Sequence, residues 1–463
     1  MRKARPSLVL TLLLGLPLGV ASAAGAEDTT TPATPATPAT AAPVASVEVA
    51  PPPPPSTSTA TPAPTPTPAP TPPAAESARV RPRAPTAGPQ LEGPRDGVPD
   101  CRVGAAACIA NEHFALWPRL RLRAGYDLVQ PDSQVLTVGQ NDGFFLDQNR
   151  IGVDGVFKDD LRFRFIIDVV SLLPARSPND PVQPFSAAVR DAWVAWMPSD
   201  WFYLSAGQQF MPGDLEGTTT IAALPFTRRS VATSGVRPGH GFAVDGLSPA
   251  RQPGLVLGST DNARLGNVAL QYTLGIGNGN GQNILGNDNK LPAAYARLGG
   301  GYVDDAGTEI RLGLGGRYNP RTVGTLPNLF SETETLAFVD LDVRVQGIQI
   351  AAQAIYKDVA FDTLVPDFTG ESGLGATAWL TVDRPFGVDI FGLRPAYRFS
   401  YFDPSSSFAD DQLIENTLAV RWDVPAEGLP LSLIVDGTLL TEFGEGVRDL
   451  DNARLSAILQ LEL

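Results

Sequence analysis

The chain is poor in the residues that build catalytic or metal centres. Its 463 residues include only 2 histidines, His113 and His240, and 2 cysteines, Cys101 and Cys108. The histidines are far apart in the sequence, and no serine or cysteine nucleophile motif accompanies either of them. Two sulfurs without a neighbouring histidine do not make a zinc site. The sequence therefore predicts no enzyme, no metal site and no bound cofactor.

Long hydrophobic runs are also scarce. The apolar stretch 8–20 covers about 13 residues, fewer than the ~20 that a membrane-spanning helix needs. It follows Arg2, Lys3 and Arg5 and precedes small residues, which is the pattern of a secretory signal peptide over residues 1–26. No later apolar window is long enough for a helical span. A secreted soluble protein and a membrane β-barrel remain as the two classes.

Positive charge is in the minority. The formal net charge is −14, which argues against a nucleic-acid partner because phosphate backbones attract lysine and arginine. Lysine is especially rare: beyond the signal peptide the chain has only Lys158, Lys290 and Lys357.

Residues 27–110 form a separate region rich in proline, threonine and alanine, with the stretches TPATPATPAT and PPPPPSTSTATPAPTPTPAPTPP. Such a composition favours extended polyproline II and cannot bury a core. We expect a disordered periplasmic linker, either a plain spacer or a ligand for peptidoglycan or another periplasmic partner. Cys101 and Cys108 lie at its end and are candidates for a small disulfide loop in an oxidising compartment. The sequence leaves open whether they are bonded or remain thiols.

Residues 111–463 change to a period of two, with apolar side chains alternating with polar or small ones. This alternation is typical of half-buried strands. It predicts about 16 strands, with boundaries uncertain by about two to four residues. They lie near 115–127, 143–157, 161–171, 187–196, 201–210, 253–260, 265–276, 292–303, 308–318, 334–345, 348–358, 372–383, 392–402, 413–424, 430–441 and 452–463.

Long and short connections alternate along this region. The stretch NPRTVGTLPNLFSE at 319–332 is predicted as a long connection, for example, and the short turn Gln346-Gly347 follows. Outer-membrane barrels alternate in this way because their strands are antiparallel, with long loops outside and short turns on the periplasmic side. The predicted fold is therefore all-β, a transmembrane antiparallel β-barrel.

The alternation also assigns the two faces of the wall. An arginine on the lipid face costs about 2–4 kcal/mol near the bilayer midplane, so the charged face must line the lumen. The arginines assigned to a pore-lining path are Arg119, Arg121, Arg123, Arg150, Arg162, Arg164, Arg311, Arg317, Arg394 and Arg398. Aromatic residues at strand ends are candidates for girdles at the membrane interfaces: Trp117, Tyr126, Trp196, Tyr318, Tyr356, Tyr401 and Trp422.

Four segments carry a resemblance to a known family. They are RIGVDGVFKDDLRFRFIID at 150–168, AVRDAWVAW at 188–196, LSAGQQFMPGDLEGTTTIAALPFTRRS at 204–230 and LGIGNGNGQNILGNDNKLPAAYARLG at 274–299. With them, the whole region 111–463 resembles the phosphate-selective porin O and P family of outer-membrane porins. The resemblance implies a homotrimer and a loop at about 211–252 that folds into the lumen as a constriction. The constriction-loop residues implied are Arg228, Arg229, Arg237 and His240.

The function that we expect is passive diffusion of small hydrophilic solutes through the barrel, with a preference for anions such as phosphate. The protein would lie in the bilayer of a Gram-negative outer membrane, with its linker in the periplasm. The scarcity of lysine departs from the family pattern and bears on phosphate specificity. A structural or adhesive barrel tied to the envelope through the linker is the alternative, and a soluble all-β binding protein is a third reading.

Overall fold

The computed structural model describes residues 109–110, 113–130, 143–158, 160–169, 188–236, 244–249, 251–281, 289, 291–304, 306–325, 328–361, 370–406, 411–424, 430–443 and 452–462. All of them belong to one compact unit, Arg83–Leu463. The predicted signal peptide, Cys101, Cys108 and all of the predicted linker except Ile109–Ala110 lie outside the described residues.

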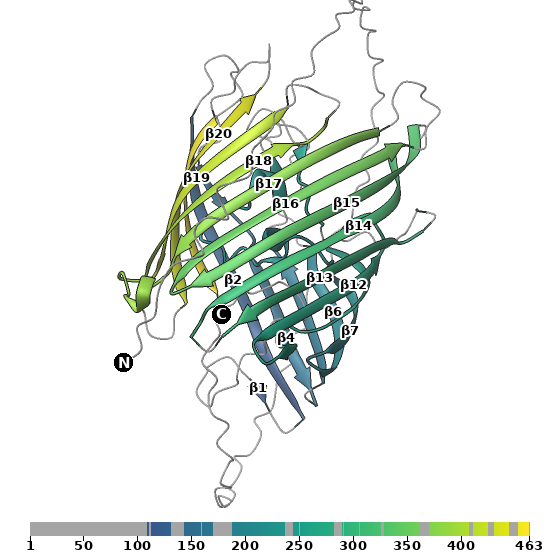
Figure 1. Ribbon diagram of the computed structural model, residues 1–463, viewed down its shortest axis with the longest axis horizontal. Helices are drawn as coiled ribbons and strands as arrows, with labels where there is room; N and C mark the ends of the chain where they lie inside the picture. Colours follow the sequence, from purple (N-terminus) through teal and green to yellow (C-terminus); the bar gives the residue numbers. More distant parts are fainter. Residues whose placement is uncertain are drawn as a thin grey trace, which may run out of the picture. The chain divides into compact units, whose positions relative to one another are not determined.

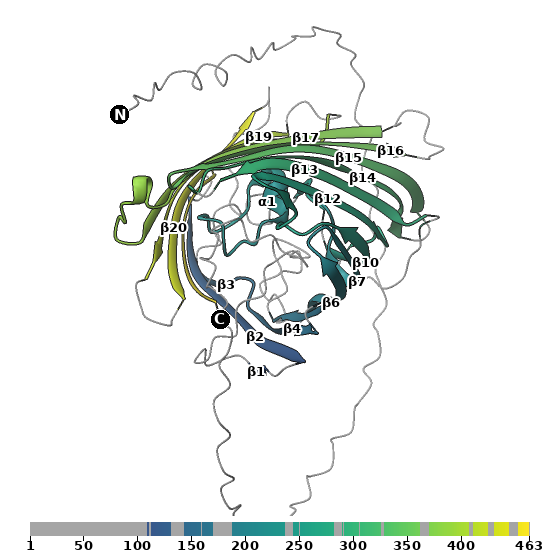
Figure 2. The same cartoon turned by 60° about the horizontal axis from the view of Figure 1, so that its bottom comes forward.

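The described strands form a closed antiparallel β-barrel with 16 strands in its wall, which confirms the predicted fold class (Figures 1 and 2). The last strand pairs with the first, so that Arg121 is aligned with Glu462 and Val129 with Arg454. The wall consists of β2 (Phe114–Val129), β3 (Gly143–Leu146) continued by β4 (Arg150–Phe157), β5 (Leu161–Asp168), β6 (Ala188–Ser199), β7 (Phe202–Phe210), β10 (Arg251–Gly258), β12 (Val268–Gly277), β13 (Ala293–Val303), β14 (Glu309–Thr325), β15 (Asn328–Val345), β16 (Ile348–Phe361), β17 (Gly370–Val382), β18 (Leu393–Asp403), β19 (Gln412–Asp423), β20 (Leu431–Phe443) and β21 (Asn452–Glu462).

Few other elements are present in the described part of the chain. Two short strands pair at the rim, β1 (Ile109–Ala110) with β2 and β11 (Arg264–Leu265) with β12. The helices are α1 (Leu215–Thr218), α2 (Val231–Ser234) and η1 (Pro385–Gly387), and β8 (Gly235–Val236) pairs with β9 (Val244–Asp245). No helix among the described residues is long and apolar enough to cross a membrane.

The wall separates an apolar outer face from a charged inner face. Neighbouring residues of β2 illustrate this: Leu122 is 43% exposed on the outside, whereas Arg123 is fully buried on the inside. Trp117 was predicted to belong to a girdle on the outer face. It lies an even number of residues from Arg121 and Arg123 on β2, so its side chain points inward like theirs, and it is only 8% exposed. That prediction was wrong. Trp196, Tyr318, Tyr356 and Trp422 do lie exposed on the outside.

The second strand of the wall is interrupted where the sequence predicted a continuous one. Residues 147–149 separate β3 from β4 and stand opposite only two residues of β2, because Leu146 pairs with Ala124 and Arg150 with Arg121. The extra residue is accommodated by Gln148, whose φ is 50°. A bulge of one residue reverses the alternation, so that side chains at odd-numbered positions face inward before it and those at even-numbered positions face inward after it. It thereby brings the Asp147 carboxylate to 2.7 Å from the Arg123 guanidinium.

The wall is much taller on one side than on the other. The stretch 319–332, predicted as a long connection, instead extends β14 and β15, whose pairing continues to Thr325 opposite Asn328. These strands have 17 and 18 residues, whereas β5 and β10 have 8 each. The hydrogen-bonded hairpin satisfies its own backbone groups, so the expected long connection is absent here.

Candidate functional site

The connection between β7 and β10 lies inside the barrel, where α1 is seen within the ring of strands (Figure 2). We call its described residues, 211–236 and 244–249, the inner loop. Each of its two helical turns is capped: Asp214 accepts a hydrogen bond from the Gly217 N–H at 2.9 Å, and Ser230 caps α2. Capping fixes short turns that would not be stable alone.

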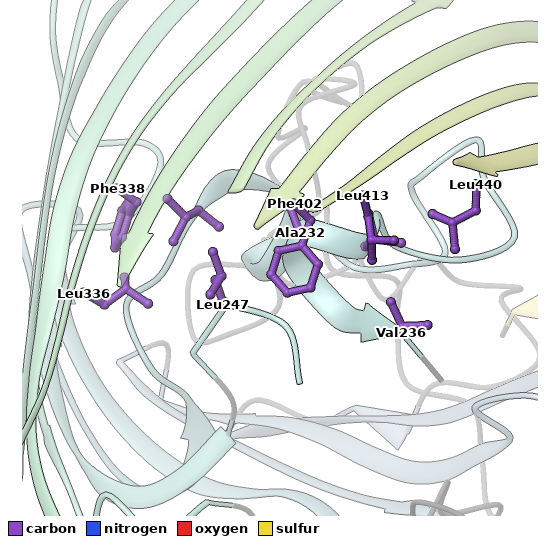
Figure 3. Packing of buried hydrophobic residues seen from close by; sticks show 10 residues of the cluster. Ala232, Val236, Leu247, Leu336, Phe338, Phe402, Leu413 and Leu440 are labelled. Carbon is purple, nitrogen blue, oxygen red and sulfur yellow. The ribbon is translucent and has the colours of Figure 1, made fainter. Parts of the chain in front are cut away.

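Apolar contacts attach the inner loop to the side of the wall formed by β15–β20. Val231, Ala232, Val236 and Leu247 pack against inward residues of the wall (Figure 3). Those wall residues are Leu336, Phe338, Ile355, Phe402, Leu413 and Leu440. A second cluster places Leu215, Ile221, Leu224 and Phe226 on Ala351, Trp379, Ala396 and Ala419. An apolar patch inside a water-filled lumen would be unfavourable, so these side chains stabilise the loop against the wall.

Arg398 of β18 is the centre of a buried ionic network under the inner loop. Its guanidinium donates to the Glu216 carboxylate at 3.0 Å and to the Glu415 carboxylate at 3.0 Å and 2.5 Å. It also donates to the Arg228 carbonyl at 2.8 Å and lies over the Phe226 ring. Arg398 is 1% exposed. It therefore holds the loop and does not face open lumen.

Glu216 connects this network to the rest of the loop. Its carboxylate accepts hydrogen bonds from the Ser230 N–H at 3.0 Å and from the Thr233 hydroxyl at 2.7 Å. Its backbone N–H donates to the Gln353 side chain of β16 at 2.8 Å. Because α2, Arg398 of β18 and Gln353 of β16 all bond to this one residue of α1, the two helical turns are fixed to the wall as a single unit.

The inner loop is also bonded to strands on either side of the barrel seam, the pairing of β2 with β21. Arg123 of β2 donates to the Thr227 carbonyl at 2.9 Å, while the Thr227 N–H donates to Asp436 of β20 at 2.7 Å. Arg228 of the loop pairs with Asp127 of β2. The loop thus narrows the barrel interior between β2 and the wall formed by β15–β20.

Nearly all of the arginines predicted for the pore-lining path face inward beside a carboxylate. Ion pairs join Arg119 and Arg164 to Asp154, Arg121 to Glu462, Arg123 to Asp147, Arg150 to Asp168, Arg311 to Glu309, Arg317 to Glu334, Arg394 to Asp383 and Asp423, and Arg398 to Glu216 and Glu415. Arg162 lies on β5 and also has an interaction partner. Paired in this way, the arginines present dipoles with little net positive charge.

Arg229 of the inner loop differs from these arginines. Its guanidinium donates to the backbone carbonyls of Glu216 at 3.1 Å and Thr219 at 2.6 Å. Among the described residues, no carboxylate forms an ion pair with it. Arg229 is half-buried. Its positive charge is near enough to interact with that of Arg123, and the charges of Arg121 and Arg421 also interact with Arg123. Arg237 and His240, the other predicted constriction residues, lie outside the described residues.

Burial changes the chemistry of one acid in the inner loop. Asp214 is buried, and desolvation raises the pKa of its carboxyl above the usual range, although hydrogen bonds from Ser248 and Gly217 oppose the rise. Its role is to cap α1. Within the described part of the chain, no group of three or more histidine, cysteine or acidic side chains is arranged to hold a metal ion.

Sequence reasoning missed the residues that fix the loop. Glu216, Glu415 and Gln353 are not near one another in the sequence, and each resembles an ordinary polar residue of a strand or loop. The available signal was the acidic pair Asp214 and Glu216 in MPGDLEG, beside an apolar segment that has no reason to be apolar in a solvated loop.

Comparisons with known proteins agree with this architecture. No protein-family model matches the chain and no curated protein is significantly similar to it in sequence. Among solved structures, the outer membrane channel DcaP of Acinetobacter baumannii matches with a TM-score of 0.50 at 13% identity, over 77% of this chain and 100% of that chain. The anion-selective porin from Comamonas acidovorans matches with a TM-score of 0.49 at 9% identity, over 76% and 100% of the two chains.

At such low identity, these likenesses concern the fold alone. The described chain has the fold of outer-membrane channels: a closed antiparallel barrel with a polar interior and one long loop inside it.

Proposed function

We propose that this protein is an outer-membrane porin, a passive diffusion channel for small hydrophilic solutes. The observation that carries the proposal is the inner loop, which is fixed inside a closed barrel whose inner face is charged. Lumen charges tune which ions enter a barrel, and a loop inside it sets the size limit. In a soluble β-sandwich, an outer face of exposed leucine, isoleucine and phenylalanine would be in contact with water, which is unfavourable.

A preference for anions such as phosphate is the finer part of the proposal, in line with the resemblance to the phosphate-selective family. Its support is Arg229, whose guanidinium is not neutralised by a carboxylate among the described residues. The ion pairs of the other arginines argue for a modest preference, because paired charges attract anions weakly.

Planar bilayer recordings of the purified protein test both parts. The proposal expects discrete conductance steps and a reversal potential in a KCl gradient that reports anion preference, reduced conductance being expected when phosphate competes. A cation-selective reversal potential would refute the anion preference while leaving the channel intact. The absence of any conductance would refute the channel.

The second candidate, a structural barrel tied to the envelope by its proline-rich linker, is favoured by the depth at which the loop is buried. Phe226, Thr227, Ser230 and Ala232 are all completely buried, as expected of a plug. A folded, heat-modifiable barrel that never conducts would support this candidate.

A homotrimer is also part of the proposal. Strands of 8 or 9 residues, such as β5, β7 and β10, are short. At about 3.3 Å per residue and a tilt of about 45°, they cover about 19–21 Å, less than the ~25 Å apolar band of a barrel. A neighbouring protein subunit would cover the part of the wall formed by these short strands better than lipid would. Cysteine cross-linking at Phe165 of β5, analysed in the membrane, is expected to yield linked subunits.

A further inference from the structure

The turn that joins β17 to β18 is apolar and unusually exposed. Residues 383–392, which we call the β17–β18 turn, lie at the end of the barrel where β2 begins and β21 ends. Val388 is 60% exposed and Phe391 is 87% exposed. The next connection at the same end, Gln346-Gly347, is polar. Two exposed apolar side chains this close together form a small patch, and exposed apolar patches often mark an interaction site.

The turn is held in shape by its own hydrogen bonds. The Asp389 carboxylate accepts from the Gly392 N–H at 2.8 Å, and the Val388 N–H donates to the Pro385 carbonyl at 3.0 Å. Phe391 itself has a φ of 60°, a left-handed conformation that glycine adopts without cost. An aromatic residue in a strained position indicates that its ring is useful there.

The turn continues the apolar outer face of the wall. Leu393, immediately after it, is paired with Trp422 of β19, and both are partly exposed on the outside. In both views the light-green turn at the end of β17 and β18 projects beyond the wall and not beneath the lumen (Figures 1 and 2). Through Leu393 and Trp422, the turn therefore adjoins the apolar outer face at the strand ends.

The position of the turn identifies its partner. In the order of strands around the barrel, β17 and β18 lie opposite the short strands β5, β7 and β10, where we place the subunit interface. The β17–β18 turn would then face lipid and not a second copy. Exposed Arg384 and Asp389 flank its apolar side chains, as expected at the level of headgroups.

We propose that the β17–β18 turn is a membrane anchor. Val388 and Phe391 insert into the boundary between phospholipid headgroups and acyl chains of the adjacent leaflet, while Arg384 remains among the phosphates. Aromatic side chains favour this interfacial depth. The anchor fixes the vertical position of the tall side of the barrel in the bilayer.

Site-directed spin labelling measures this depth directly. The full chain would carry Cys101→Ser and Cys108→Ser, and one nitroxide label on Phe391→Cys, in vesicles of phosphatidylethanolamine and phosphatidylglycerol. Power saturation compares collisions with oxygen, which concentrates in the acyl region, and with a water-soluble nickel chelate. The matched control is Gln346→Cys, because Gln346 is also exposed and has a φ of 50° in a turn at the same end. Leu459→Cys on the outer face provides the reference for acyl depth.

The label at 391 is expected to collide more often with oxygen than with the chelate, as at 459, and the label at 346 to show the reverse. Equal chelate access at 391 and 346 would overturn the proposal. Dipolar broadening between labels at 391 would also overturn it, because a second copy would then cover the turn. A label on Val388→Cys repeats the measurement if the label at 391 disturbs the turn. None of these readouts requires a conducting channel.

Discussion

Arg398 of β18 donates a hydrogen bond of 3.0 Å to the carboxylate of Glu216, a residue of the inner loop that lies 182 positions earlier in the chain. Both side chains are almost completely buried. Removing one partner of a buried ion pair leaves an uncompensated charge, which is far costlier than losing an exposed pair. This contact therefore makes the position of the loop sensitive to single substitutions.

Arg398→Met is expected to destabilise the protein by about 3–5 kcal/mol, because Glu216 and Glu415 would remain buried together without a cation. Urea unfolding of the reconstituted barrel measures the loss. Arg384→Met is the control: Arg384 and Asp389 form an exposed pair at 3.9 Å, and losing such a pair costs about 0–1 kcal/mol. Equal midpoints for the two variants would contradict a fixing role for Arg398. If the variant still conducts, we expect larger and noisier current steps, because the loop is held less firmly.

Arg229→Gln is expected to reduce the anion-to-cation permeability ratio. One unit charge at about 4 Å in water attracts an anion by about 1 kcal/mol and repels a cation by as much. The ratio should therefore fall by roughly thirtyfold at most. Reversal potentials in a KCl gradient measure the ratio. Arg164→Gln serves as the control, because the Arg164 charge is already paired with Asp154 at 2.7 Å. A larger effect for Arg164 than for Arg229 would show that carboxylate pairing does not decide which arginine attracts ions.

Gly207→Ala is expected to destabilise the barrel by on the order of 3 kcal/mol. Gly207 has a φ of 126°, and an added Cβ would lie 2.1 Å from the Ala192 carbonyl oxygen in the neighbouring strand. Gly437→Ala in β20 is the matched control, because a Cβ there meets nothing within 4 Å. The measurement is the urea midpoint of each variant, and similar midpoints would contradict the clash.

Asp411→Asn is expected to alter how stability depends on pH. Burial, and next the negative charge of Asp403, raise the pKa of the Asp411 carboxyl to about 6. Because the folded pKa lies above the unfolded one, protonation favours the folded state. The native protein should lose stability as pH rises from about 4 to about 6, by about 1 kcal/mol once solvent screening of this partly exposed group is considered.

The asparagine variant lacks this titration. It should be more stable than the native protein above about pH 6, and the difference should vanish below about pH 4. Unfolding midpoints of both proteins across this range provide the test. A constant difference at all pH values would mean that Asp411 contributes through packing and not through charge.

The period-two pattern was sufficient to locate every wall strand, because each inward or outward position is decided by contact with lumen or lipid along a single strand. The alternation of Leu122 with Arg123 required no tertiary information. The pattern failed where a single extra residue, at 147–149, reversed the parity. It also failed at 319–332, where turn-like residues continue a hairpin. Neither the extra residue nor the extended hairpin changes the local amino-acid composition, so a pattern read along one strand does not reveal them.

The candidate site was predicted only in part. Arg228 and Arg229 were placed in a loop between β7 and β10, and the structure puts them inside the barrel. The carboxylates beside the arginines, such as Asp147 and Glu415, come from distant strands, and only their pairing across the closed sheet brings them together.

The sequence by itself determined the fold class of the protein: alternating strands that must close into a barrel, since open edges and outward arginines are both too costly in lipid. Only the tertiary structure decided how the inside is arranged. Ion pairs and apolar contacts form between residues separated by up to 182 positions, as in Arg398 and Glu216, and their energies depend on burial and distance. Those quantities exist only once the wall has closed around the loop.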